Sequence, residues 1–338
     1  MRKLFISVMT LILCLSLISA CGTASNAATT TTTAKYISAS GWVTETTPAT
    51  IEFLSVWGTA STDVFAVGKV GTVFQYNGKT WSELNGAWEK TGNGVATPDF
   101  SGVWGFSPTD VIVVPRGSMG NFEHWDGKTW TTMTQDGYLA GDFTSVWGTS
   151  LSDVFAVAIG GNIAHFDGQI WNNMKNTNLV SGFNDVWGSS STDIFAAGGI
   201  GVVGKTGGLV EASGILHYDG SIWSTMTVNS SNELNGIWGT SPKDVFAVGL
   251  FGTIFHYDGT AWTQMDSGTT SHIGGVCGRS ASDVYAVGQG GLILHYDGQA
   301  WKQMDSGTSS DLTSVWCNAT SDVFAVGADG TILRLPAK

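Results

Sequence analysis

Short apolar segments alternate with glycine-rich turns along this chain, and the pattern repeats about every 40 residues. In the copy from Leu234 to Met265, the segment L-N-G-I-W-G is followed by D-V-F-A-V-G, then by T-I-F-H-Y and W-T-Q-M. Each segment has the length of a strand, is rich in Val, Ile, Phe and Trp, and is apolar at neighbouring positions rather than at alternate ones. The pattern predicts four strands per repeat, with both faces buried.

One tryptophan marks each repeat near the end of its first predicted strand. Cys277 takes its place in the sixth unit. The seven anchors, 39 to 51 residues apart, are Trp57, Trp104, Trp147, Trp187, Trp238, Cys277 and Trp316. A period near 40 with four strands per unit is typical of the blades of a β-propeller and not of a helical solenoid.

The turn residues agree with this interpretation. An Asn-Gly or Asp-Gly pair recurs between the third and fourth strands, as in Asn77-Gly78 and Asp258-Gly259. Such pairs favour tight hairpins, because glycine adopts a positive φ without steric cost. We therefore expect a hairpin at each of these positions.

The count of strands predicts how the ring closes. The seventh unit stops near Leu335 without a fourth strand, and a spare strand-like segment, Trp42 to Thr44, precedes the first unit. We expect this N-terminal segment to complete the last blade, since an open sheet edge invites aggregation. The predicted fold class is all-β: a seven-bladed β-propeller of four-stranded antiparallel blades over residues 36–336.

The N-terminal residues predict export and a lipid anchor. Arg2 and Lys3 precede an apolar stretch over residues 4–17, and Ile18-Ser19-Ala20-Cys21 matches the lipobox of bacterial lipoprotein signals. We expect residues 1–20 to be removed and Cys21 to be acylated, which gives stable two-chain anchoring. The alternative is an ordinary secretory signal with a chance cysteine. Residues 21–35, rich in Thr, Ala and Ser, predict a flexible tether.

Charge limits the possible partners. The chain has 15 Lys and Arg against 27 Asp and Glu, a formal net charge of −12, and no basic cluster. Nucleic-acid binding needs a cationic surface, so this class is disfavoured. We expect an extracytoplasmic domain at a bacterial cell membrane or outer membrane, in contact with the membrane through its lipid anchor only.

Two further cysteines form a candidate disulfide. Cys277 and Cys317 lie one repeat apart, on the predicted inner strands of blades six and seven. Inner strands of neighbouring blades run close together, so the Cα separation that a disulfide needs is attainable. Two free buried thiols are the alternative.

An aspartate recurs at the start of every second strand. A residue present in every blade belongs to the scaffold more readily than to a site, so we interpret these carboxylates as turn caps that accept backbone N–H groups. The set comprises Asp63, Asp110, Asp153, Asp193, Asp244, Asp283 and Asp322.

Five histidines share one position of the third strand: His124, His165, His217, His256 and His295. Equivalent positions on adjacent blades are separated by about 10 Å, the usual spacing of packed sheets. Ligands of one metal ion must lie far closer together. We therefore expect these side chains to pack or to form hydrogen bonds, and we predict neither a metal nor a cofactor.

The G-T-I-x-H-Y-D-G-x-x-W units resemble Asp-box (bacterial neuraminidase repeat) propellers and propellers similar to the photosystem II assembly factor. The resemblance covers all seven units and implies the propeller fold. In the Asp-box pattern, D-x-G-x-T-W, one residue separates Asp from Gly. Here Asp258 precedes Gly259 directly and Trp262 comes one residue early, so the activities of that family do not carry over.

Sialidase chemistry, which the resemblance raises, needs three arginines around one carboxylate. We expect Arg116 on one face of the ring and Arg279 and Arg334 towards the opposite face. Three arginines placed in this way do not converge, which argues against a sialidase.

Loops that differ between blades are the candidate ligand-binding surface, because repetition marks the scaffold. We define the loop face as the face that carries the blade-to-blade connections and the turns between second and third strands. An insert over residues 200–213 is expected to join it. The candidate ligand-binding residues are Trp88, Lys90, Arg116, Met119, Tyr138, Phe183, Phe251 and His272. Aromatic side chains beside a few polar groups suit a protein, a peptide or a glycan.

The sequence therefore predicts a monomeric, non-catalytic lipoprotein that binds a protein, peptide or glycan through its loop face. One alternative is a carbohydrate-active, glycosidase-like enzyme that uses two carboxyl groups among Glu89, Asp99, Asp136 and Asp142. A further alternative, by analogy with the photosystem II factor, is an assembly or scaffold factor.

Overall fold

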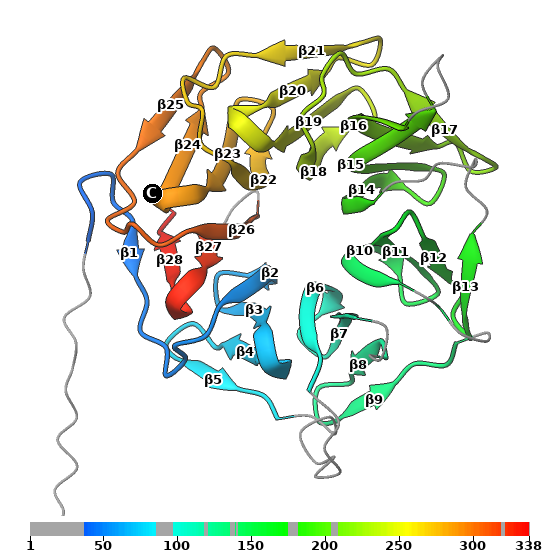
Figure 1. Cartoon of the computed structure of the whole chain (residues 1–338). Helices are drawn as coiled ribbons and strands as arrows, with labels where there is room; N and C mark the ends of the chain where they lie inside the picture. Colours follow the sequence, from blue (N-terminus) through cyan, green and yellow to red (C-terminus); the bar gives the residue numbers. More distant parts are fainter. Residues whose placement is uncertain are drawn as a thin grey trace, which may run out of the picture. The chain divides into compact units, whose positions relative to one another are not determined.

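The computed structural model describes residues 37–85, 97–117, 121–135, 139, 141–174, 182–203, 209–318 and 322–337. Residues 35–338 form one structural unit. In its described part, seven four-stranded antiparallel sheets are arranged around a central axis (Figure 1). This arrangement confirms the predicted seven-bladed β-propeller. The predicted signal sequence, the tether and Cys21 lie outside the described residues.

The blades follow one another along the chain, and each runs from its inner to its outer strand. The first three blades consist of β2 (Phe53–Ala60), β3 (Asp63–Gly68), β4 (Val73–Tyr76) and β5 (Trp81–Glu83); β6 (Asp99–Ser107), β7 (Asp110–Arg116), β8 (Glu123–Trp125) and β9 (Trp130–Thr132); and β10 (Asp142–Ser150), β11 (Asp153–Ile159), β12 (Ile163–Phe166) and β13 (Trp171–Met174).

The remaining blades repeat this order. They consist of β14 (Phe183–Ser190), β15 (Asp193–Val203), β16 (Leu209–Tyr218) and β17 (Trp223–Met226); β18 (Leu234–Ser241), β19 (Asp244–Gly249), β20 (Ile254–Tyr257) and β21 (Trp262–Met265); β22 (Ile273–Ser280), β23 (Asp283–Gly288), β24 (Leu292–Tyr296) and β25 (Trp301–Met304); and β26 (Leu312–Cys317), β27 (Val323–Gly327), β28 (Ile332–Leu335) and β1 (Val43–Thr44). Single 3-10 turns connect second and third strands at η1 (Lys69–Gly71), η3 (Leu250–Gly252), η4 (Gln289–Gly291) and η5 (Ala328–Gly330).

The ring closes through the N-terminal strand. β1 pairs antiparallel with β28, with Val43 opposite Arg334 and Thr44 opposite Leu333. Trp42 is fully buried beside this strand, and its ring meets that of Tyr285 edge to face, with centroids 6.3 Å apart. The predicted closure is confirmed, so both ends of the described chain are held in one blade (Figure 1).

Burial on both faces explains why the strands are not alternately polar and apolar. In β3, Val64, Phe65, Ala66 and Val67 are all fully buried, although successive side chains point to opposite faces of the sheet. Each blade packs between two others, so both faces are interior.

Contacts between a tryptophan and a glycine of the inner strands connect neighbouring blades, and five of the seven inner strands have a Trp-Gly pair. A Cβ added at Gly105 would lie 2.8 Å from the ring of Trp57, and one added at Gly188 would lie 2.6 Å from the ring of Trp147. The indole of one blade therefore rests on the backbone of the glycine in the next blade. Only glycine leaves room for this contact.

The hairpins between third and fourth strands form as predicted. Gly259 has φ +90°, and Oδ1 of Asp258 accepts the backbone N–H groups of Thr260 and Ala261 at 2.8 and 2.9 Å. These two bonds lower the pKa of Asp258. The Asp or Asn at this position stabilises its own hairpin, as Asn77 does in blade one.

Blade four differs from the expectation at its insert. Residues 200–213 were expected to form a variable loop. Instead, β15 and β16 continue their antiparallel pairing as far as Val203 opposite Leu209. Residues 200–203 and 209–213 of the insert extend these two strands, because they satisfy their backbone groups in the same ladder.

No helix in the described ranges is long and apolar enough to cross a membrane.

Candidate functional site

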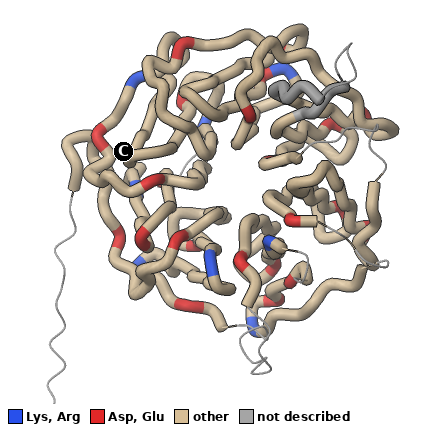
Figure 2. Tube along the Cα trace, in the orientation of Figure 1, with Lys and Arg blue, Asp and Glu red and all other residues tan. Residues whose placement is uncertain are grey.

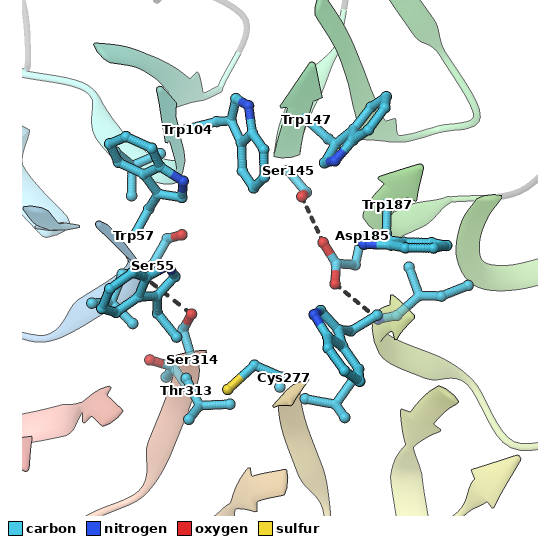
Figure 3. Close-up of a pocket in the computed structure, with 18 of the residues that line it drawn as sticks. Ser55, Trp57, Trp104, Ser145, Trp147, Asp185, Trp187, Cys277, Thr313 and Ser314 are labelled. Atoms are coloured by element: carbon cyan, nitrogen blue, oxygen red, sulfur yellow. Dashed lines mark hydrogen bonds between the residues drawn. The ribbon is translucent and has the colours of Figure 1, made fainter. Parts of the chain in front are cut away.

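The seven inner strands surround a channel along the propeller axis, with a volume of about 370 Å³ (Figure 3). All seven anchor positions line it: Trp57, Trp104, Trp147, Trp187, Trp238, Cys277 and Trp316. Trp104, Trp187, Trp238 and Trp316 keep part of their surface exposed. The ring centroids of Trp57 and Trp104 are 5.9 Å apart. Six tryptophans therefore form part of the channel wall, together with Ser, Thr and Asn side chains.

Asp185 is the one acid in this wall among the described residues, and the wall contains no Lys, Arg or His. Its position in the repeat, two residues before the anchor, is small and uncharged in the other blades: Ser55, Gly102, Ser145, Gly236, Gly275 and Ser314. Our sequence analysis missed this residue. An aspartate at a position where the other six blades have Ser or Gly is the signal in the sequence that points to Asp185.

Three hydrogen bonds hold the carboxylate of Asp185. Oδ1 accepts the hydroxyl of Ser145 at 2.6 Å and the backbone N–H of Val186 at 2.9 Å, and Oδ2 accepts the backbone N–H of Ile237 at 2.9 Å. These bonds connect blades three, four and five (Figure 3). Burial nevertheless raises the pKa of Asp185 to about 6, because these three bonds do not offset the loss of hydration.

A disulfide joins Cys277 to Cys317 across blades six and seven, with Cα atoms 5.6 Å apart. Both cysteines line the channel. Where the other blades place an indole at the anchor, blade six therefore places a covalent link to its neighbour.

A second cavity, of about 410 Å³, lies at the mouth of the channel on the loop face. Arg116, His272, Gln289 and Asp311 are part of its lining. Seven residues, one from each blade, line both cavities: Leu54, Ser101, Thr144, Asn184, Asn235, Gly274 and Thr313. The mouth therefore opens into the channel.

An acidic rim surrounds the loop-face end of the inner strands. We define it as the residue before the first buried apolar residue of each inner strand. It is acidic in five blades, at Glu52, Asp99, Asp142, Glu233 and Asp311, and is Gly182 and His272 in the other two. Figure 2 shows acidic positions around the whole ring and fewer basic ones. Lys69 neutralises one rim acid through its contact with Glu52, 2.5 Å from Nζ to Oε2.

Rim residues also hold the turns of the preceding blade. Oδ1 of Asp99 accepts the backbone N–H of Val70 at 2.8 Å. Asp311 receives the N–H of Gly290 at 2.7 Å in the same way. These bonds fix the turns between second and third strands against the next blade.

Two of these turns present apolar side chains in an unfavourable conformation. Val70 has φ +56° and Phe251 has φ +55°, and the two residues are 64% and 60% exposed. The left-handed region is costly for residues with a Cβ, most of all for β-branched ones. Blade six has Gly290 at the equivalent position, so the turn itself does not require an apolar side chain.

The candidate loop-face residues have different outcomes. Arg116 is exposed and lines the mouth together with His272. Phe251 is exposed beside His272, with ring centroids 4.9 Å apart. Trp88, Lys90, Met119 and Tyr138 lie outside the described residues.

The assignment of Phe183 to the loop face is wrong. This residue begins β14 and is fully buried in the core between blades three and four. It occupies the same repeat position as Phe53, which is also fully buried. The first apolar residue of each inner strand belongs to the interior.

The assignment of the strand-two aspartates to turn caps is also wrong. Oδ1 of Asp153 contacts Nε2 of His165 at 2.8 Å, and Asp110, Asp193, Asp244 and Asp283 form equivalent bonds with the other four histidines at 2.6 to 2.8 Å. His165 pairs with Phe155, two residues beyond Asp153, so the two side chains share a face diagonally. The hydrogen-bonding role expected for the histidines is confirmed.

Arg116, Arg279 and Arg334 do not gather around one ligand. Arg279 binds Asp283 through Nε at 2.7 Å, and Arg334 binds Glu45 and Asp322 at 2.8 Å each. Arg116 lines the mouth on the loop face, whereas Arg279 ends β22 at the opposite side of its blade. The arrangement agrees with the expected separation of Arg116 from Arg279.

The described residues contain no group of three or more His, Cys, Asp or Glu side chains that could hold a metal ion. Two of the acids considered for glycosidase chemistry, Glu89 and Asp136, lie outside these residues. Of the other two, Asp99 accepts the backbone N–H of Val70 through its carboxylate. Neither Asp99 nor Asp142 lines the described mouth cavity.

Fold and site together define the class: a seven-bladed β-propeller with an axial channel, lined in part by tryptophans, that opens on an acidic loop face. Neither a protein-family model nor a curated protein sequence matches the chain. Solved structures do.

"YCF48 bound to D1 peptide" is similar with a TM-score of 0.69 and 18% identity, over 88% of this chain and 97% of that one. YCF48 from Cyanidioschyzon merolae gives 0.67 and 16%, over 87% and 98%. The WD40 β-propeller domain of Doa1 gives 0.66 and 12%, over 89% and 96%. At these identities the similarity shows the fold alone.

Proposed function

We propose that this protein is a non-catalytic binding propeller that holds a peptide segment of a partner protein on its loop face. One observation carries the proposal: Val70 and Phe251 stay in the left-handed region while their apolar side chains are exposed. A left-handed residue with a Cβ costs about 1–2 kcal/mol. Strain of this kind persists mainly at functional positions.

The surroundings of these turns suit a partner. Ile159, 42% exposed, lines the mouth cavity on the same face, so three of the large exposed apolar side chains lie on the loop face. Arg116, His272 and the acidic rim supply polar contacts around them. Apolar anchors surrounded by polar groups are typical of binding surfaces.

The comparison with YCF48 supports a peptide as the ligand, since a propeller of this fold has been solved with a D1 peptide bound. At 18% identity it supplies no residue-level equivalence. The location of the contact in this chain rests on its own exposed side chains.

The proposal includes attachment at the extracytoplasmic side of a bacterial membrane. The sequence Ile18-Ser19-Ala20-Cys21 and the Thr-rich segment that follows it support this part. A tether of residues 21–35 would let the loop face reach partners near the membrane.

The test is a cross-linking pull-down of the full-length protein from its native membranes. The variant Val70→Gly/Phe251→Gly removes both apolar side chains and relieves the left-handed strain. The matched control is Ile222→Ser, which removes an equally exposed apolar residue, 62% exposed, from an outer hairpin. Loss of a partner with the double variant alone supports the loop face. Equal recovery of all partners by the wild type and both variants overturns it.

A further inference from the structure

The channel combines the negative charge of Asp185 with partly exposed tryptophan rings, and no Lys, Arg or His is among the described residues that line it. Asp185 has no basic side chain beside it in the described lining, and Trp187 lies two residues further along β14, on the same side of the strand. The acidic rim surrounds the mouth above it. All three features favour a positively charged ligand, because carboxylates and indole faces both attract cations.

The scaffold does not need a charged side chain at the position of Asp185. Ser314 performs the equivalent task between blades seven and one, where its Oγ accepts the backbone N–H of Val56 at 3.4 Å. A neutral side chain therefore suffices to connect one inner strand to the next. The carboxylate adds charge in a place where burial disfavours charge.

The carboxylate also has capacity for one more donor. Two carboxylate oxygens accept about four hydrogen bonds in total. Asp185 receives three, from Ser145, Val186 and Ile237. A donor that enters from the channel can make the fourth.

Size and access are compatible with a small group. The channel volume of about 370 Å³ is near the lower end of the range of small-ligand pockets. The seven residues shared with the mouth cavity open a route from the loop face. The hydroxyl and amide groups of Thr313, Asn184 and Asn235 are polar partners along this route.

We propose that the axial channel binds a primary alkylammonium group, with its nitrogen at Asp185 and its alkyl chain against the indoles of Trp187 and Trp238. The group comes either from a free aliphatic diamine or from a lysine side chain of a bound peptide. Only the second source depends on the function proposed above. The site is a specificity pocket at the bottom of the loop-face mouth.

The experiment titrates the full-length protein with diaminopentane and with a blocked lysine amide, by calorimetry and by tryptophan fluorescence. Pentanol and the Nε-acetylated form of the same lysine amide are the neutral counterparts. We expect saturable binding of at least one amine and none of the neutral compounds. Binding of the diamine alone identifies a free amine as the source, and binding of the lysine amide identifies a side chain.

Asp185→Asn keeps the shape and the acceptor for Ile237 but removes the charge. It should weaken amine binding by about tenfold or more, since hydrogen bonds to charged groups are roughly twice as strong as neutral ones. Asp185→Ser, the residue found in three other blades, is the second variant should the amide disturb folding. Asp258→Asn makes the same change of net charge in an outer hairpin, away from the channel and its mouth, at a position where blade one has Asn77. It should leave the affinity nearly unchanged.

Three results would overturn the proposed site. They are no saturable amine binding by the wild type, an amine affinity in both Asp185 variants equal to that of the wild type, or binding of the neutral compounds as tight as that of the amines. The titration uses no partner protein. It therefore fails or succeeds independently of the loop-face pull-down. Retained amine binding in Val70→Gly/Phe251→Gly would show that the channel acts apart from the exposed turns.

Discussion

The backbone N–H of Phe251 donates to Nδ1 of His272 at 3.1 Å, across the junction of blades five and six. This bond requires the tautomer of His272 that carries its hydrogen on Nε2. It holds the turn of one blade against the inner strand of the next. An exposed phenylalanine is thereby fixed in a conformation that glycine adopts more easily.

Phe251→Gly should leave the free energy of unfolding unchanged or raise it, by up to about 1 kcal/mol. The change removes the left-handed strain of a residue with a Cβ, and the entropy cost of glycine offsets part of this gain. Denaturant unfolding measures it. Ile222→Gly is the control, because Ile222 is not among the residues with positive φ and glycine there should destabilise. A clear loss of stability in Phe251→Gly would contradict the claim that the left-handed conformation of Phe251 is strained.

The stability of the protein should depend on pH through Asp185. Its pKa is about 6 in the folded state, against about 3.9 for an unfolded aspartate. The folded state therefore holds the proton more tightly, and the resulting stability is complete below pH ~4 and is lost as the pH rises through ~6. As the pH rises from ~4 to above ~6, the free energy of unfolding of Asp185→Ser should increase relative to that of the wild type by up to roughly 3 kcal/mol.

The control for this effect is Ser314→Ala, which alters the equivalent position in another blade without a titrating group. Its difference from the wild type should be the same at both pH values. Unfolding curves of all three proteins at pH 4 and pH 7 provide the comparison. A pH-independent gap between Asp185→Ser and the wild type would refute the raised pKa.

Gly188→Ala should destabilise the ring by about 1–3 kcal/mol, as is usual for overpacked sites. The added Cβ would lie 2.6 Å from the ring of Trp147, a residue that is only 6% exposed. Gly199→Ala is the matched change, because its nearest neighbour is the flexible side chain of Glu233 at 3.6 Å. Thermal unfolding of both variants separates steric conflict from a general cost of replacing glycine.

Cys277 and Cys317 should react with an alkylating reagent only after reduction and unfolding, as intact mass will show. Cys277→Ser/Cys317→Ser should lower the free energy of unfolding by about 2–4 kcal/mol, the usual contribution of a disulfide. The link closes a loop of sequence separation 40 between blades six and seven. Alkylation of both thiols in the unreduced, unfolded protein would show that the bond is absent.

Cys21→Ala should move the protein from the membrane fraction to the soluble fraction, because lipid can no longer be attached at that position. Metabolic labelling with a fatty acid, followed by fractionation, measures both effects. Cys277→Ser serves as the control for loss of a cysteine as such. Unchanged labelling of Cys21→Ala would exclude the proposed anchor.

The sequence by itself determined the number of blades, the order of strands and the closure of the ring. These features depend on local patterns: strand-forming residues, Asp-Gly turns and a period that recurs in every unit. The segment from Trp42 to Thr44 was recognisable because the seventh unit lacked its outer strand. A repeated local pattern therefore predicts the fold even when the contacts between distant residues are not known.

Only the tertiary structure decided which recurring side chains meet. It paired Asp153 with His165 across two strands, placed Phe183 in the core and showed that residues 200–203 and 209–213 extend a ladder. Each of these outcomes depends on register and on the neighbouring blade. Asp185 lines a channel only because seven inner strands, distant in sequence, surround it. Burial and electrostatics are properties of that enclosure, so no local pattern contains them.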